Sequence, residues 1–483
     1  MSARHTPRFS VRPRFAPAAL VLALSLAACT TVGPNYRLPG NALVNAPLAH
    51  APLDTNGAPV SQDPVPSNWW QLYDDPALNA LVEEALKSNT NLRVAAANLA
   101  RSRAALAVAN AQGGFSGGVS AGFQRAQESA EQYLLFSKLP IEYEGDVGVK
   151  LAYEVDLFGK LRRGVEAANA DSEAVAAAGD LARIEVVADV VRAYVESCSA
   201  AEELAIAQES LTLQRERVDL TRRLRDAGRG NQPDVTRGVT QVQTLAADVP
   251  RYESQRRIAH YQLAMLLARS PADLPPGALT CTRLPTLAQP IPVGDGATLL
   301  KRRPDVREAE RQLAASTARI GVAVSELYPS ITIGASAGTT GIASDLFGPA
   351  TNRWAFGPLI SWTFPVNGQR QRVLEAEAAT GGALAHFDGV VLNALNETQA
   401  SLAAYAADYE RAETLRSAYE SARESADETH RLYAAGRESF LADLDATRTL
   451  TTVHAQVAAA DGQVALDQVR LFQALGGGWE KAD

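Results

Sequence analysis

The sequence predicts an α+β membrane protein made of two similar halves, each with two strands and two very long helices. Three observations support this fold class. The motif Arg-Leu-Arg-Asp-Ala-Gly-Arg at 223–229 recurs as Arg-Leu-Tyr-Ala-Ala-Gly-Arg at 431–437, 208 residues later (431 − 223). Each half contains segments in which apolar and polar residues alternate. A helical segment without proline follows them, at 159–227 and at 368–435. Such internal similarity indicates one structural unit used twice.

The N-terminus predicts a lipoprotein signal peptide over 1–28. Arginines precede an uncharged apolar run at 15–26, which is too short to span a bilayer comfortably. The run ends in Leu-Ala-Ala-Cys, which resembles a bacterial lipobox, so we expect a covalent lipid on Cys29. An ordinary signal with a chance cysteine is the alternative. Thr30 favours the outer membrane, and we expect no other cofactor and no metal ion.

Charge and hydropathy restrict the partners. The formal net charge of −8 becomes −12 once the four arginines of the signal are removed (−8 − 4), which argues against nucleic acid as a partner. No segment after Leu26 has the continuous apolar run of a membrane helix, so we expect any membrane-spanning part to consist of strands.

The remaining elements follow in order along the chain. Residues 29–73 are rich in proline and small residues and predict an extended, lipid-anchored segment, not a folded domain. Acids and a proline near 74–76 are a helix-start signal. The further expected segments are helices over 74–112, a β-hairpin over 113–158, a long helical hairpin over 159–269, a proline-rich connector over 270–303, a helix over 304–326, a second β-hairpin over 327–367, a second long helical hairpin over 368–475 and a C-terminal tail over 476–483.

The strands carry the membrane prediction. Over 143–157 mostly apolar residues take the odd positions and mostly charged residues the even ones. A soluble, half-buried sheet has the same pattern, but lipid-anchored export and aromatic residues such as Tyr143 and Trp354 favour a transmembrane barrel. Four strands are too few to close a bacterial barrel, so we expect the chain to oligomerise.

The long helices indicate a tube or a stalk. At 1.5 Å per residue, the first would be roughly 100 Å long. We expect Pro250 to bend or break the helix that returns from the first hairpin tip. We also expect Gly381 and Gly382 to interrupt the second long helix.

An enzyme is not expected from this sequence. Its six histidines are scattered, and it has no paired-histidine metal motif and no nucleophile elbow. A structural coiled-coil lipoprotein that acts as a spacer between envelope layers is one alternative function. It would explain the lipid and the long helices but not two strand pairs placed alike in both halves.

Several motifs together carry a family resemblance. They are Gly-Pro-Asn-Tyr at 33–36, Trp-Trp at 69–70, Asp-Leu-Phe-Gly-Lys at 156–160, Arg-Arg-Pro-Asp-Val-Arg at 302–307, Tyr-Pro-Ser at 328–330 and the two Ala-Gly-Arg tips. In their order and spacing the chain resembles the TolC-like outer-membrane efflux factors, in particular their NodT-type lipoprotein branch. The resemblance covers essentially all of the mature chain.

The resemblance implies an assembly and a function. It implies a homotrimer with one twelve-stranded outer-membrane barrel, four strands per subunit, continued by a periplasmic α-helical barrel. The connector over 270–303 and the chain ends would form an equatorial belt. The implied partners are outer-membrane lipids, a periplasmic adaptor (membrane fusion) protein and an inner-membrane RND-type pump, with the chain as exit duct for drugs or metal ions. A type I secretion exit duct is a further alternative.

The resemblance also assigns roles to the hairpin tips. Leu441, Asp445 and Asp443 would form a periplasmic gate, although on the residues alone Asp445 could be a solvated helix-face acid. The tip and adaptor-contact positions are Gly228, Arg229, Asp234, Tyr433, Gly436 and Arg437. Asp234 and Tyr433 match positions that tie neighbouring tips together in some relatives. Glu438 replaces an arginine of those relatives, so the latch is expected to use Arg437 or Arg229.

Two further cysteines remain. Cys198 lies on the apolar stripe of the first long helix, and Cys281 lies in the connector. Two interpretations are possible. The cysteines could be one buried and one exposed free thiol, or they could form a disulfide that pins the connector to the helix, which export to an oxidising compartment allows.

Overall fold

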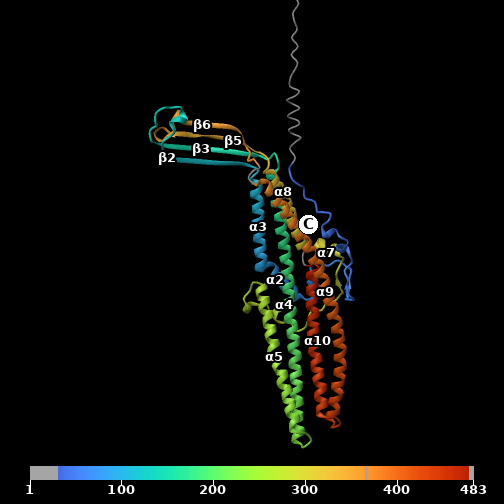
Figure 1. The fold of residues 1–483 in the computed structure, drawn as a ribbon. Helices are drawn as coiled ribbons and strands as arrows, with labels where there is room; N and C mark the ends of the chain where they lie inside the picture. The colour runs from blue at the N-terminus through green and yellow to red at the C-terminus, as the bar shows by residue number, and fades with distance from the viewer. Residues whose placement is uncertain (1–30, 365–367, 478–483) are drawn as a thin grey trace, which may run out of the picture. The chain divides into compact units, whose positions relative to one another are not determined.

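The helices occur in pairs of matched length, which agrees with the spacing of the repeated motif (Figure 1). The pairs, with 22, about 67 and 35 residues, are α3 (Thr90–Ala111) with α8 (Pro304–Ser325), α4 (Lys160–Asp226) with α9 (Gln369–Ala434), and α5 (Gln232–Leu266) with α10 (Phe440–Ala474). The other helices are short: α2 (Pro76–Ser88), α6 (Pro276–Leu279) and α7 (Gly296–Arg302). Among the helices described, none is long and apolar enough to cross a membrane.

The computed structural model describes residues 31–364 and 368–477, which divide into two compact units. The first unit contains residues 31–38, 101–173 and 311–384. The second contains residues 39–100, 174–310 and 385–477.

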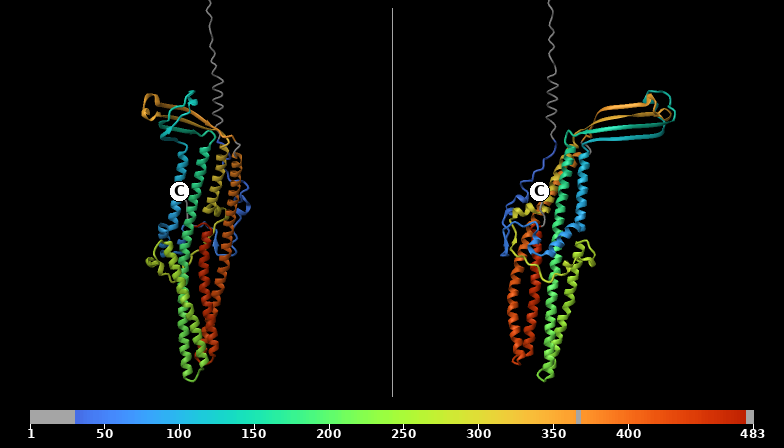
Figure 2. Two further views of the ribbon diagram at one scale, coloured as in Figure 1. Left: turned by 60° about the vertical axis from the view of Figure 1, so that its left-hand side comes forward. Right: turned by 180° about the vertical axis from the view of Figure 1, so that it is seen from behind.

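A four-stranded antiparallel sheet belongs to the first unit (Figure 2). Its order is β2-β3-β5-β6, so the two predicted hairpins are joined through β3 and β5. The strands are β2 (Phe115–Ala126), β3 (Glu142–Val155), β5 (Ser330–Ile342) and β6 (Asn352–Ser361). The register pairs Phe115 with Tyr153 across the first hairpin and Ile331 with Ile360 across the second.

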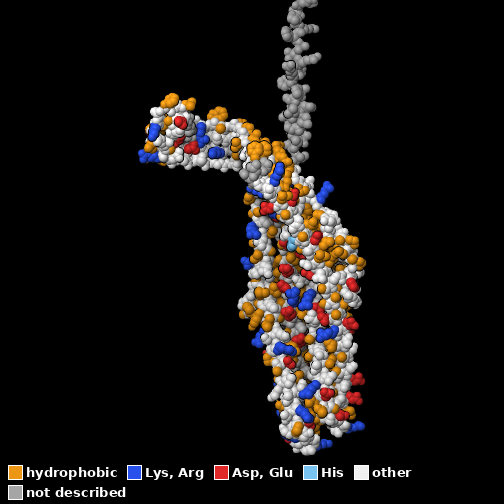
Figure 3. All heavy atoms as spheres, viewed as in Figure 1, with side chains coloured by type: hydrophobic (Ala, Val, Ile, Leu, Met, Phe, Trp, Pro, Cys, Tyr) orange, Lys and Arg blue, Asp and Glu red, His pale blue; other side chains and the backbone are white. Residues whose placement is uncertain are grey.

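Large apolar side chains of the sheet are exposed (Figure 3). Phe115, Val119, Trp354 and Phe356 are each at least 74% exposed. An apolar surface of this extent is rare on a soluble monomer and marks contact with a membrane or with other protein. The sheet therefore lacks a covering layer within its own unit.

The junction of strands and helices holds the first residues that the structure describes. The guanidinium of Arg163 is almost fully buried and donates to the backbone oxygens of Val32 and Gly33, each at 3.1 Å, and to Asn35 Oδ1 at 2.7 Å. Gly33 has φ +84° and lies so close to Gly321 that a Cβ on it would be 2.4 Å from the Gly321 Cα. Only glycine fits at that position. The clamp fixes the chain a few residues after Cys29.

The second unit contains the main hydrophobic core. The ring of Trp69 stacks on Phe472 of α10 with centroids 4.6 Å apart, and both side chains are almost fully buried. Val187 of α4, Leu263 of α5 and Leu402 of α9 belong to the same core. The core thus joins the helices of both long hairpins.

The segment before α2 is packed, which corrects the prediction of an extended tether. Leu53, Val65 and Trp69 are buried in the core. Short 3-10 helices (Leu43–Asn45, Pro47–His50 and Trp69–Tyr73) and the strand β1 (Val60–Ser61) occur here, and β1 pairs in parallel with β4 (Ile291–Pro292) of the connector. The segment has the composition of a linker, but a few large apolar side chains are enough to dock it on the hydrophobic core.

The predicted interruption at Gly381 and Gly382 is wrong, and Pro250 does not break its helix. α5 continues through Pro250, and α9 continues through Gly381 and Gly382. A glycine costs about 1 kcal/mol relative to alanine and a proline about 3 kcal/mol inside a helix. These local costs are outweighed by the hydrogen-bonded helical turns before and after each residue and by the tertiary packing of the long helices.

Candidate functional site

The tips of the two helical hairpins have the same backbone structure. Gly228 and Gly436 adopt φ of +73° and +72°, the left-handed conformation that ends helices at glycine. At each tip the residue after the glycine donates to a carbonyl five residues back, from Arg229 to Leu224 at 2.8 Å and from Arg437 to Leu432 at 2.9 Å. These are the hydrogen bonds of a Schellman motif, and they explain the repeated Ala-Gly-Arg sequence.

The helix that follows each tip begins with a side-chain cap. The carboxamide of Asn231 accepts from the backbone N–H of Asp234 at 3.0 Å, and the hydroxyl of Ser439 accepts from that of Ala442 at 3.2 Å. Such caps satisfy backbone donors that have no partner within the helix. Each tip is therefore a fixed turn between two antiparallel helices, as Figure 2 shows.

The first turns of α10 have two different faces. Leu441 is 58% exposed, and Asp445, one helical turn later, is exposed on the same face. Phe440, Asp443 and Leu444 are buried on the other face. The structure therefore places the predicted gate residues Leu441 and Asp445 together. Asp443, the third predicted gate residue, lies apart from them on the buried face.

Asp443 belongs to a buried polar cluster that joins three helices. Its Oδ1 accepts from Nη1 of Arg217 in α4 at 3.0 Å and lies 3.2 Å from Nδ1 of His430 in α9. Arg217 also donates to the hydroxyl of Thr447, which in turn donates to the Asp443 carbonyl at 2.7 Å. Asp443 is 1% exposed. The cluster connects the first hairpin to both helices of the second near the tips.

Sequence reasoning missed this cluster, although a signal existed. Asp443 and Thr447 share the helix face of Phe440 and Leu444, at positions spaced by three or four residues. An acid within an apolar stripe needs a buried partner of opposite charge. The partner itself, Arg217, is 226 residues away in the chain, and nothing local identifies it.

The predicted latch residues have other partners. Asp234 Oδ1 accepts from Arg237 of its own helix at 3.3 Å. The hydroxyl of Tyr433 lies 3.5 Å from that of Thr221 in α4, and its ring is 5.9 Å from that of Phe440. The side chains of Arg229 and Arg437 are exposed, and in the described part of the chain neither has an acid within ion-pair distance. Among the described residues, Arg217 pairs with an acid across the two hairpins, whereas Arg229 and Arg437 do not.

A disulfide joins Cys198 of α4 to Cys281 of the connector, with Cα atoms 5.2 Å apart. Both residues belong to the second unit and are buried. The bond ties the connector to the long helix at the level of the main core, in which both cysteines lie.

The comparisons with known proteins agree with this geometry. The family model described as "Outer membrane efflux protein" matches residues 81–269 and 297–477. This chain belongs to the outer membrane efflux protein family. Outer membrane protein OprJ of Pseudomonas aeruginosa is 31% identical over 97% of both chains. Nodulation protein T of Rhizobium leguminosarum bv. viciae is 29% identical over 96% of this chain and 94% of its own. The solved structure of the outer-membrane channel OprN has 34% identity and a TM-score of 0.86, covering 93% of this chain and all of its own.

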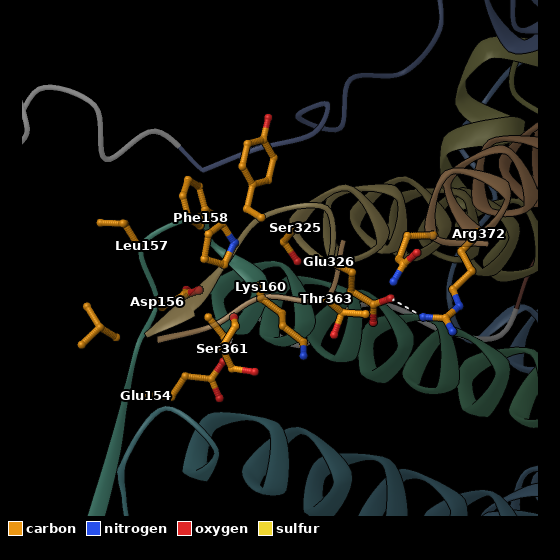
Figure 4. Close-up of a pocket in the computed structure, with 15 residues that line it drawn as sticks. Glu154, Asp156, Leu157, Phe158, Lys160, Ser325, Glu326, Ser361, Thr363 and Arg372 are labelled. Carbon is orange, nitrogen blue, oxygen red and sulfur yellow. Dashed lines mark hydrogen bonds and ion pairs between the residues drawn. The ribbon is translucent and has the colours of Figure 1, made fainter. Parts of the chain in front are cut away.

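Two further predicted or observed sites of this efflux protein are the lipid attachment residue and a polar cavity. The predicted lipid attachment residue, Cys29, lies outside the described residues. A cavity of about 230 Å³ at the strand–helix junction is lined by residues such as Glu154 and Lys160, and its Glu326 and Arg372 form an ion pair at 3.0 Å (Figure 4). Its lining contains no histidine or cysteine. In the described part of the chain, no three His, Cys, Asp or Glu side chains are placed to hold a metal ion.

Proposed function

We propose that this chain is the exit duct of a tripartite efflux pump and works as a homotrimer. Three copies of the four-stranded sheet would form a twelve-stranded barrel in the outer membrane, and the long hairpins would form a periplasmic tunnel. The observation that carries the proposal is the sheet whose large apolar side chains, Trp354 and Phe356 among them, have no cover in their own unit. Lipid and neighbouring sheets are the environment that such strands require.

The partners follow from the same proposal. A periplasmic adaptor would contact the hairpin tips around Gly228 and Gly436, and an inner-membrane pump of RND type would supply the substrates, such as drugs or metal ions. A lipid on Cys29 would hold the segment that Arg163 clamps at the membrane surface. The role of the chain is then conduction and not catalysis.

Conductance tests the proposal directly. Purified full-length protein in a planar bilayer is expected to give discrete channel openings, and the same preparation is expected to have the mass of three chains. A structural spacer would give no conductance at any voltage, which would reject the duct. Mass spectrometry of the exported protein is expected to show cleavage before Cys29 and the added mass of acyl chains. An unmodified cysteine would reject the lipid anchor alone.

Two duct functions remain to be separated. Deletion of the gene is expected to raise intracellular accumulation of small dyes and drugs, because efflux is lost. A type I secretion duct would instead leave dye accumulation unchanged and abolish export of a protein substrate.

A further inference from the structure

The loop over 343–351, which joins β5 to β6, is folded back onto the sheet. It lies at the end of the sheet farthest from α8, the helix that leads into β5 (Figure 1). The loop contains two short 3-10 helices, Ala343–Asp345 next to β3 and Pro349–Thr351 next to β5. Because β3 and β5 are the two central strands, the loop covers the middle of the sheet and not its edges.

Two glycines make room for this loop. Gly145 of β3 and Gly341 of β5 are register partners in the sheet. A Cβ on Gly145 would be 2.6 Å from Cδ2 of Leu346, and a Cβ on Gly341 would be 2.5 Å from Cγ2 of Thr351. Both distances are well below van der Waals contact between carbon atoms. The paired glycines therefore form a flat seat on which the loop rests.

The glycine seat belongs to the apolar face of the sheet. Side chains two residues apart in a strand point to the same face. Tyr143 and Val149 therefore share the face of Gly145, and both are more than half exposed. Ala337 pairs with Val149 on one side and with Trp354 on the other, so Trp354 lies on this face too. This is the face that the proposed barrel turns towards lipid.

The opposite face is polar at the same level of the sheet. A Cβ on Gly148 of β3 would point to that face and would be 2.9 Å from Nη2 of Arg353. Arg353 donates from Nη2 to Asp146 Oδ2 at 2.6 Å and from Nε to the hydroxyl of Thr340 at 2.7 Å. Polar faces of barrel strands line the lumen. The loop therefore folds away from the proposed lumen.

Phe347 is a large apolar side chain of this loop and is 79% exposed. Next to it, Leu346 is half-buried against the glycine seat. Phe347 extends an apolar surface that already exists at this end of the sheet, where the exposed rings of Phe123 and Tyr143 stack with centroids 5.6 Å apart. A second copy is not the expected cover, because copies in the proposed barrel would meet at the edge strands β2 and β6.

We infer that the loop over 343–351 docks on the outer leaflet of the outer membrane, with Phe347 inserted among the acyl chains. Aromatic side chains are favoured at the level where acyl chains meet the headgroups. Because the loop is seated on the outer face, it leaves the exit of the proposed duct uncovered. The inference rests on the proposed barrel and specifies a lipid contact at its rim.

Fluorescence quenching in the full-length protein tests the position of Phe347. Phe347→Cys, labelled with the fluorophore NBD, is placed in phosphatidylcholine vesicles that contain lipids with a nitroxide on the acyl chain. We expect the nitroxide lipids to quench the label strongly and aqueous iodide to quench it weakly. Phe356→Cys and Ala355→Cys, adjacent in β6 and on opposite faces, are the lipid-facing and lumen-facing references. Wild-type protein treated in the same way gives the background of its own cysteines.

The glycine seat offers a matched pair of variants in the Phe347→Cys protein. Gly145→Val is expected to push Leu346 off the seat, with a loss of lipid quenching and a gain of iodide quenching at the label. Gly117→Val, on the same face of β2, is the control. A Cβ there would be 3.7 Å from its nearest neighbour, so both quenching levels should stay unchanged.

The outcomes separate the loop docking from the proposed function. If iodide quenches Phe347→Cys as strongly as Ala355→Cys while lipid quenches Phe356→Cys, the docking is wrong and the barrel stands. If Phe356→Cys and Ala355→Cys are quenched alike, the proposed barrel is wrong and the docking is rejected with it. Equal lipid quenching in the Gly145→Val and Gly117→Val proteins would overturn the role of the glycine seat.

Discussion

Asp443 shows how one buried charge can connect two hairpins. Its carboxylate is 2% exposed and is paired with Arg217, whose side chain is 17% exposed. A buried ion pair adds little stability compared with apolar residues of the same size. Removal of one partner is nevertheless destabilising, because it leaves an isolated buried charge. The side chain of Asp445, two residues later, is exposed and accepts no hydrogen bond in the described part of the chain.

Asp443→Ala is expected to loosen the hairpin tips. It leaves the Arg217 guanidinium without its carboxylate, a loss on the order of 3–5 kcal/mol. Trypsin should then cleave faster after Arg229 and Arg437, which follow the two tip glycines. Asp427→Ala, which removes an exposed acid of α9, is the control and should leave the cleavage rate unchanged. Equal rates in Asp443→Ala and the wild type would show that the cluster does not hold the tips.

Asp467 of α10 predicts a pH dependence of stability. Burial, followed by the hydrogen bond and charge of Asp408, raises the pKa of Asp467 to about 6, and Arg470 opposes the rise. A folded pKa above the unfolded value means that the folded state binds the proton more tightly. The stabilisation is then complete below about pH 4 and is lost as the pH rises through 6.

The substitution Asp467→Asn tests this dependence. The variant keeps a neutral side chain at all pH values, so its Tm at pH 8 is expected to exceed that of the wild type by a few degrees, with the difference shrinking towards pH 5. Asp427→Asn, at an exposed site of α9, should follow the wild-type curve. A parallel fall of Tm with pH in wild type and Asp467→Asn would show that the Asp408–Asp467 pair is not responsible.

At the scale of elements, the disulfide fixes the connector to a long helix. The bond between Cys198 and Cys281 closes a loop of 83 residues. In the chain-entropy account, such a crosslink stabilises by up to about 4–5 kcal/mol. Cys198→Ser with Cys281→Ser is expected to increase hydrogen exchange in 270–303 while α10 changes little. Thiol counting on denatured wild type should find no free thiol unless reductant is added, and two free thiols without it would reject the bond.

The elements differ in how well the sequence predicts them. The strands and the matched helices were predictable, because alternation and repeated motifs extend over many residues. The docking of the segment that contains Leu53 and Trp69 was not, because a few buried side chains outweigh a linker-like composition. The continuation of α9 through Gly381 was missed for a related reason. The sequence shows the local cost of the glycine but not the tertiary packing that outweighs it. At the tips, the resemblance pointed to Leu441 and Asp445, which share one exposed face, whereas the partner of Asp443 could be identified only from the fold.

At the scale of the whole molecule, threefold assembly multiplies the effect of one exposed acid. Leu441 and Asp445 lie on one face of α10 next to the tip, and three copies would place three leucines and three carboxylates around one axis. Like charges at short range repel, and the repulsion grows where water is excluded. The proposed gate therefore holds an electrostatic strain that opening or a bound cation would relieve.

Removal of that acid should favour conduction. Open Asp445→Ala channels in a planar bilayer are expected to pass more current than open wild-type channels, because no cation held by the carboxylates obstructs the constriction. Addition of a divalent cation should lower the wild-type current and affect the variant less, since the acidic ring is its binding site. Asp427→Ala removes an exposed acid of α9 and serves as the control, with wild-type conductance expected. If Asp445→Ala and Asp427→Ala behave alike, Asp445 is a solvated surface residue, and the constriction must be sought elsewhere along the hairpins.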